Sequence, residues 1–142
     1  MSPLRFVPVV LLLTAPAVFA DGAWRALWNG RDLSGWTTWL GRPEPTDDLP
    51  GFARSKDGRF LEPLGVGQDP LRVFSVVTAD GRPAIRISGQ VPGTLSTSRP
   101  HGGYHLRLQF KWGDKKWPHQ LKSLRDSAIF FHGYDLSGMG AS

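Results

Sequence analysis

Nine consecutive residues, 104–112, alternate without exception between apolar and polar side chains, and this pattern constrains the fold more than any other. Successive side chains of a β-strand point to opposite faces of a sheet, so a strand here would have one apolar and one polar face. A helix would scatter the same apolar residues around its circumference. The polar positions carry cationic, imidazole and amide groups and no carboxylate: His105, Arg107, Gln109 and Lys111. We therefore predict a strand over 104–112 with its apolar face on the core.

The rest of the chain consists of short β-type segments separated by turn residues, and no long helical period is visible. We expect further strands over residues 24–28, 37–40, 73–78, 84–88, 93–97 and 127–132. Asp80-Gly81 favours positive φ at both central positions of a two-residue hairpin turn, so the strands on either side of it should pair. Only 120–124 could form a brief helical turn. Many short strands with turn signals favour an all-β antiparallel sandwich over a barrel.

Residues 41–70 are interrupted by proline and glycine throughout. We expect a long surface loop pinned to the core by Phe52, Phe60 and Leu61. A loop of this length is uncommon unless it is functional or disordered. A solvated connector is the alternative.

Residues 1–20 have the pattern of a secretory signal peptide, with Arg5 near the start, an apolar run, and Ala20 at the cleavage position. An uncleaved membrane anchor is the alternative, but the apolar run is short for a span and is broken by Pro8 and Pro16. We expect a mature chain of residues 21–142 that is exported to the periplasm or the cell exterior and has no stable membrane span. The absence of cysteine excludes disulfides, thiolate metal sites and a cysteine nucleophile.

The formal net charge of +5 could attract nucleic acid, anionic lipid or acidic glycans. Export makes nucleic acid the least expected of these partners. The chain also ends on a polar, glycine-rich stretch directly after a segment patterned like a central strand. We therefore expect an incomplete fold that lacks its C-terminal strands and leaves a hydrophobic edge.

Four segments in sequence order resemble the 3-keto-disaccharide hydrolase domain family of exported bacterial proteins. They are WRALWNGRDLSGW at 24–36, DPLRVFSVV at 69–77, YHLRLQFKWGDKKW at 104–117 and RDSAIFFH at 125–132. The resemblance implies a concanavalin A-like, laminin G-like jelly-roll sandwich, with residues 21–142 forming the N-terminal part of the domain. It also implies a hydrolase or lyase acting on 3-keto glycosides. Ala128 stands where the family usually has glycine, and the family continues into Glu- and Gln-rich strands that this sequence lacks.

Cleavage of a 3-keto glycoside requires a base for the acidified C2 proton, a cation or donor at the enolate oxygen, and an acid at the leaving oxygen. Histidine suits the first role because its unperturbed pKa is about 6.5. His132 and His105 are the candidates, although His105 could also be an ordinary exposed strand residue. Asp126 would share a strand face with His132, but it could instead pair with Arg125 or cap a turn.

Cations near these groups could hold the enolate, and an aromatic ring could stack on the apolar C–H face of a sugar. We predict two sets of site residues on this basis. The catalytic set is His132, Asp126 and Arg125, and the substrate-binding set is His105, Arg107, Lys111 and Phe130.

No cofactor is predicted with certainty. A divalent metal could use His132 with Asp135, or Asp47-Asp48, but two ligands without a fixed pattern are a weak indication. Two other functions stay open. One is a non-catalytic carbohydrate-binding or adhesion module on the same sandwich, because fold alone does not decide function. The other is a basic protein that binds acidic polymers through Lys111, Lys115, Lys116, Lys122 and Arg125.

Overall fold

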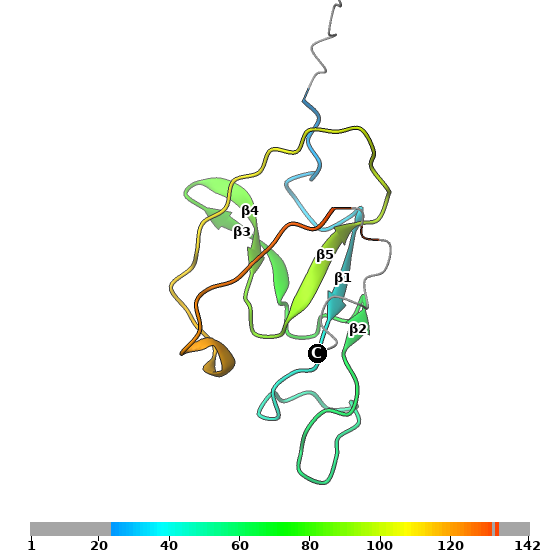
Figure 1. Cartoon of the computed structure of the whole chain (residues 1–142), viewed down its shortest axis with the longest axis vertical. Helices are drawn as coiled ribbons and strands as arrows, with labels where there is room; N and C mark the ends of the chain where they lie inside the picture. The colour runs from blue at the N-terminus through cyan, green and yellow to red at the C-terminus, as the bar shows by residue number, and fades with distance from the viewer. Residues whose placement is uncertain (1–23, 132, 134–142) are drawn as a thin grey trace, which may run out of the picture.

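The protein is all-β, as predicted, and consists of two small antiparallel sheets (Figure 1). The computed structural model describes residues 24–131 and 133. Its elements are β1 (Trp36–Leu40), β2 (Gly65–Val66), β3 (Phe74–Ala79), β4 (Arg82–Ile87), β5 (Gly93–Thr97) and a 3₁₀ turn, η1 (Pro118–Gln120). One sheet has the order β2-β1-β5, and the other is the β3-β4 hairpin. Within the described ranges there is no α-helix, no closed barrel, and no helix that could cross a bilayer.

The hairpin and the β1–β5 pair confirm four of the predicted strand regions, 37–40, 73–78, 84–88 and 93–97. Asp80 and Gly81 have φ values of 50° and 73°, so both central turn positions are left-handed as the dipeptide predicts. β5 occupies the predicted residues 93–97, and Leu40 pairs with Gly93 in its register with β1. At this position a Cβ would lie 2.5 Å from the carbonyl oxygen of Trp39, so the close approach of the two strands requires glycine.

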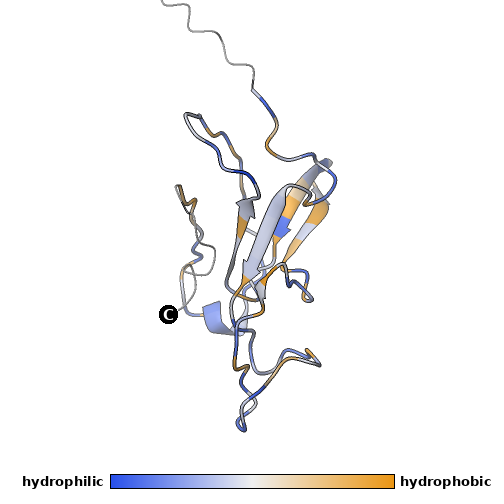
Figure 2. Ribbon diagram, turned by 90° about the vertical axis from the view of Figure 1, so that its right-hand side faces the viewer, coloured by the Kyte–Doolittle hydropathy of each residue, from blue (hydrophilic) through white to orange (hydrophobic). Residues whose placement is uncertain are grey.

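The core lies where the end of β1 meets the start of β3, and it therefore joins the two sheets. Figure 2 shows hydrophobic positions both on the strands and along the connecting loops. Its seven buried members are Leu40, Leu49, Phe60, Leu64, Val73, Phe74 and Val91. Three of them come from the long loop, so that loop is packed rather than solvated. Phe60 and Phe52 anchor it as predicted, whereas Leu61 is exposed, and its predicted anchoring role is wrong.

Arg54 holds the long loop in shape. Its Nη1 donates to the carbonyl oxygens of Pro45 at 2.7 Å and Gly58 at 2.9 Å, and its Nη2 donates to that of Asp47 at 2.5 Å. The guanidinium carbon also lies 3.8 Å from the ring centroid of Phe60, which is a cation–π distance. One side chain thus connects three turns of the loop to a core aromatic ring.

We expect Arg54→Met to lower the free energy of unfolding by about 1–3 kcal/mol, because two partly buried carbonyl groups and one exposed carbonyl group lose their donor. Urea denaturation measures this change. Arg42→Met is the matched control, since Arg42 is exposed and makes one hydrogen bond, from Nε to the carbonyl oxygen of Leu61. Equal losses in the two variants would contradict the role assigned to Arg54.

Residues 104–112 are not a strand, contrary to the sequence prediction. The segment is extended but no described strand pairs with it, and no backbone–backbone hydrogen bond among the described residues involves it. Its apolar side chains are all exposed, from 40% for Leu106 to 73% for Phe110. The alternation specifies two faces, but a strand also needs a neighbouring ladder, which the described chain does not supply.

Two further predicted strands are also absent. Residues 24–28 and 127–131 have no ladder, and Ile129, Phe130 and Phe131 are exposed. The ring centroids of Tyr104 and Phe131 lie 6.3 Å apart, so the unpaired segments 104–112 and 127–131 approach each other. The predicted helical turn begins two residues earlier than expected, at Pro118, whose fixed φ suits the first helical position.

Asp32 closes the turn that precedes β1. Its Oδ1 accepts hydrogen bonds from Asn29 Nδ2 at 2.7 Å and from the backbone N–H of Ser34 at 2.8 Å. These hydrogen bonds stabilise the carboxylate and lower the pKa of Asp32 below the ordinary value of 3.8. The bond from Asn29 has the largest effect. A depressed pKa means that this contribution to stability is present above about pH 3.8 and is lost as the pH falls through the folded-state pKa.

We expect Asn29→Ala to raise the pKa of Asp32 toward 3.8, because the principal donor to its carboxylate is removed. An NMR titration of the carboxyl carbons measures the midpoint. Asp57 is an internal control, since its pKa is lowered mainly by a hydrogen bond from Ser55 and should not change. An unchanged midpoint for Asp32 would show that Asn29 is not responsible.

Candidate functional site

Segment 104–112 carries three of the predicted substrate-binding residues past the β3–β4 hairpin. Lys111 Nζ lies 2.6 Å from Asp80 Oδ2 at the hairpin turn, which fastens the segment to the two-stranded sheet. Both side chains are more than half exposed, so we expect this pair to contribute at most about 1 kcal/mol. The pair matters mainly for position, because it places the basic side chains of segment 104–112 beside the β3–β4 hairpin.

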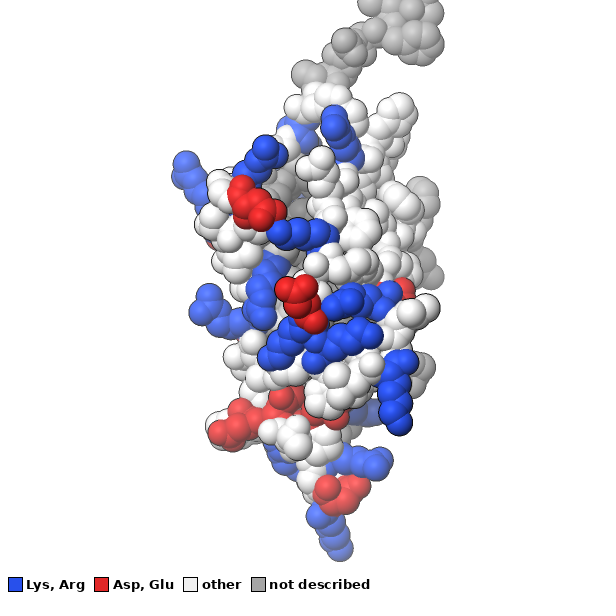
Figure 3. All heavy atoms as spheres, turned by 90° about the vertical axis from the view of Figure 1, so that its left-hand side faces the viewer, with Lys and Arg blue, Asp and Glu red and all other residues white. Residues whose placement is uncertain are grey.

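A shallow hollow of about 420 Å³ lies between the segment and the first residue of β4. It is lined by Arg82, Arg107, Leu108 and Gln109. Within the described part of the chain, neither guanidinium group has an ion-pair or hydrogen-bond partner. Lys and Arg predominate on this side of the molecule (Figure 3). The hollow therefore presents two cations, an amide and an apolar surface.

The other predicted residues lie elsewhere. Arg125 Nη2 donates to the carbonyl oxygen of Asp114 at 3.0 Å. Asp126 is exposed and does not pair with Arg125, and Phe130 is 62% exposed on an unpaired segment. His132 lies outside the described residues, so its predicted position beside Asp126 stays a prediction. His105 is exposed. The structure thus brings Arg107 and Lys111 to one face and does not join Asp126 to them by any contact it describes.

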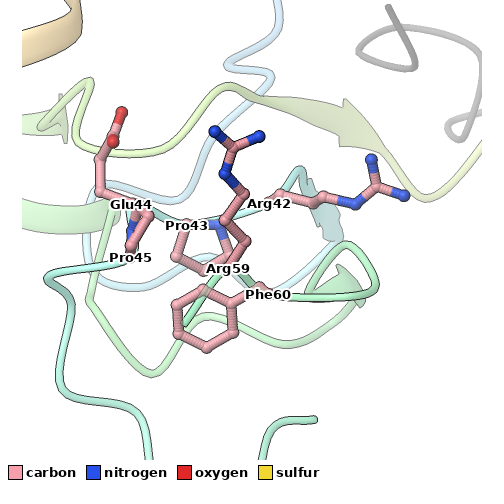
Figure 4. A pocket seen from close by; sticks show the side chains of 6 residues that line it. All are labelled: Arg42, Pro43, Glu44, Pro45, Arg59 and Phe60. Carbon is pink, nitrogen blue, oxygen red and sulfur yellow. The ribbon is translucent and has the colours of Figure 1, made fainter. Parts of the chain in front are cut away.

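A second hollow of about 410 Å³ lies in the long loop (Figure 4). It is lined by Arg42, Pro43, Glu44, Pro45, Arg59 and Phe60. Figure 4 shows the Glu44 carboxylate and the guanidinium groups pointing away from the Phe60 ring. The cations here already have partners, because Arg42 donates to a loop carbonyl and Arg59 Nε lies 3.2 Å from Asp57 Oδ2.

The edge of this second hollow contains a carboxylate–imidazole pair that the sequence did not predict. His119 Nδ1 lies 3.2 Å from Glu44 Oε1. η1 brings His119 there because Trp117 Nε1 donates to the carbonyl oxygen of Ser88 at 2.7 Å and docks the turn beside β4. Pro118 indicates a turn in the sequence, but no local pattern pairs these residues, since they lie in different segments of the chain.

The suggested metal ligand Asp47 has a structural role instead. Its Oδ1 accepts from Gln90 Nε2 at 2.6 Å, and its Oδ2 accepts from the backbone N–H of Glu44 at 3.0 Å. Both oxygens therefore cap and tether the loop. In residues 24–131 and 133, no three His, Asp or Glu side chains gather closely enough to hold a metal ion. The pair His132 and Asp135 lies outside these ranges.

Comparison with known proteins identifies one family. Neither the curated proteins nor the solved structures include a match to the chain. The model of the 3-keto-alpha-glucoside-1,2-lyase-like domain matches residues 23–140, which is most of the chain and includes the hairpin, the long loop and segment 104–112. Its extent confirms the resemblance of the four sequence segments, and the chain belongs to the 3-keto-alpha-glucoside-1,2-lyase-like domain family.

Proposed function

We propose that the chain is an exported carbohydrate-active protein that cleaves 3-keto glycosides by elimination or hydrolysis. The match of the lyase-like family model over residues 23–140 carries this proposal. We further propose that the two antiparallel sheets belong to a jelly-roll sandwich, and that residues 1–20 direct export and are removed before Asp21.

The proposed reaction begins with removal of the C2 proton, which the neighbouring ketone acidifies. His132 takes this proton, and Asp126 supports the imidazolium that forms. The electron pair flows into the ketone to give an enolate, whose oxygen is stabilised by Arg125, Arg107 or Lys111. The enolate then expels the C1 oxygen, which leaves with a proton as an alcohol. Water adds to the resulting double bond in the hydrolytic outcome, and the unsaturated sugar departs in the lyase outcome.

The described cations and aromatic groups support this assignment. Arg107 has no acidic partner among the described residues, so its charge is available to an enolate or another anion. His105, Lys111 and Phe130 are also exposed and accessible to a sugar. The Phe130 ring would stack on the apolar face of the pyranose.

A 4-nitrophenyl 3-keto-α-glucoside tests the function, because cleavage releases a coloured phenol. The matched substrate is 4-nitrophenyl α-glucoside, which lacks the ketone and therefore lacks an acidic C2 proton. We expect release from the keto substrate only. Equal release from both would contradict proton abstraction at C2.

A non-catalytic carbohydrate-binding module is the second candidate. The exposed, edge-to-face pair of Phe110 and Trp112, with centroids 5.7 Å apart, favours it because such surfaces bind sugar rings. Saturable binding of the keto substrate without phenol release would support this alternative. Turnover would exclude it.

A further inference from the structure

The two arginines of the hollow beside β4 come from different parts of the chain. Arg82 begins β4, and Arg107 lies in segment 104–112, which the Lys111–Asp80 pair holds against the hairpin. Like charges that line one hollow repel each other unless an anion lies between them. The acid of the hairpin turn, Asp80, already pairs with Lys111. The described contacts therefore leave both guanidinium groups of this hollow without a counter-charge.

The remaining lining suits a sugar. Leu108 offers an apolar surface for C–H groups, and the Gln109 amide can both donate to and accept from hydroxyl groups. Two guanidinium forks match the planar oxygens of a carboxylate or the oxygens of a sulfate. The hollow is shallow, with a volume of about 420 Å³.

We propose that the hollow between Arg82 and Arg107 binds the anionic group of an acidic carbohydrate, a sugar that carries a carboxylate or a sulfate. This deepens the proposed carbohydrate function and rests on it, since Arg107 is one of its substrate-binding residues. Arg82 is then a specificity-determining residue that the sequence did not indicate. Because the site is exposed, binding should weaken steeply with salt.

The binding experiment uses three hexasaccharides without a 3-keto group: hexagalacturonate, a heparin hexasaccharide and neutral maltohexaose. Calorimetry on the whole chain gives each affinity at low and at physiological salt. We expect at least one anionic sugar to bind about tenfold or more tightly than maltohexaose, and the anion that does so identifies the charged group. Similar affinity for all three sugars would overturn the proposal.

Two variants and a matched control separate this hollow from a general basic surface. We expect Arg82→Gln and Arg107→Gln each to weaken binding about three- to tenfold. Each variant removes one charge-assisted contact, and such a contact is weak at an exposed site. Arg86→Gln removes the same charge from the same strand, but Arg86 does not line the hollow, so the change should be less than about twofold. An equal loss in Arg86→Gln would overturn the proposal.

The last ligand is a single-stranded oligonucleotide with the same charge as the anionic hexasaccharide that binds. If it bound as tightly as the acidic sugar and lost as much affinity in Arg82→Gln, the hollow would recognise polyanions in general and the proposal would fail. None of these measurements requires turnover. Cleavage of the 3-keto glucoside without a preference for anionic sugars would preserve the proposed function and overturn only this inference.

Discussion

His132→Ala is expected to lower kcat for cleavage of the 3-keto glucoside by about 10²–10⁴-fold, the usual contribution of a positioned general base. Alanine cannot accept the C2 proton, so the enolate would form only through water. The KM should change little, since the predicted binding groups lie on other residues. Measuring phenol release over a range of substrate concentrations separates the two constants.

The control for this variant is His101→Ala, which removes an exposed imidazole that the mechanism does not use. The rings of His101 and Tyr104 are arranged edge to face, with centroids 6.3 Å apart. Loss of the His101 ring therefore tests whether a nearby aromatic contact alone alters the rate. We expect His101→Ala to retain the full rate. An unchanged rate in His132→Ala would contradict the assignment of His132 as the base.

The parts of the fold that could be predicted depend on local chemistry. Asp80-Gly81 specifies a turn whose backbone twist matches a hairpin, so the β3–β4 pairing follows from two residues. β5 was predicted within its observed bounds, because glycine and proline residues before it and the Ser-Arg-Pro stretch after it delimit the short segment Gly-Thr-Leu-Ser-Thr.

Segment 104–112 shows where local pattern is insufficient. The alternation determines which side chains share a face, but it contains no information on which strand will pair with the backbone edges of the segment. Pairing depends on segments distant in sequence, and the described chain offers none there. The apolar face is consequently exposed, although its periodicity is the clearest in the sequence.

The candidate site divides in the same way. Arg107 and Lys111 could be predicted because both lie in one alternating run. Arg82 could not, since its proximity to Arg107 arises from an ion pair between the segment and the hairpin turn. The pair of Glu44 and His119 is also a tertiary result, because it depends on docking of the indole of Trp117 beside β4.

Leu40→Ala is expected to lower the free energy of unfolding by about 2–5 kcal/mol, the range for deletion of a buried leucine side chain. Leu40 is fully buried at the end of β1, where it pairs with Gly65 of β2 and Gly93 of β5. Neither glycine has a side chain that could fill the vacated space. The core joins the two sheets at this point, so the loss should weaken both.

Urea denaturation monitored by far-UV circular dichroism measures this loss, with an unchanged m-value indicating that compactness is preserved. Ile87→Ala on β4 is the matched control, because its side chain is 59% exposed and its truncation should cost about 0.5 kcal/mol or less. If the two variants lost equal stability, the packing around Leu40 would not be the core of this structure. A larger loss for Leu40→Ala would support the assignment of the end of β1 to the core cluster that also contains Phe74 of β3.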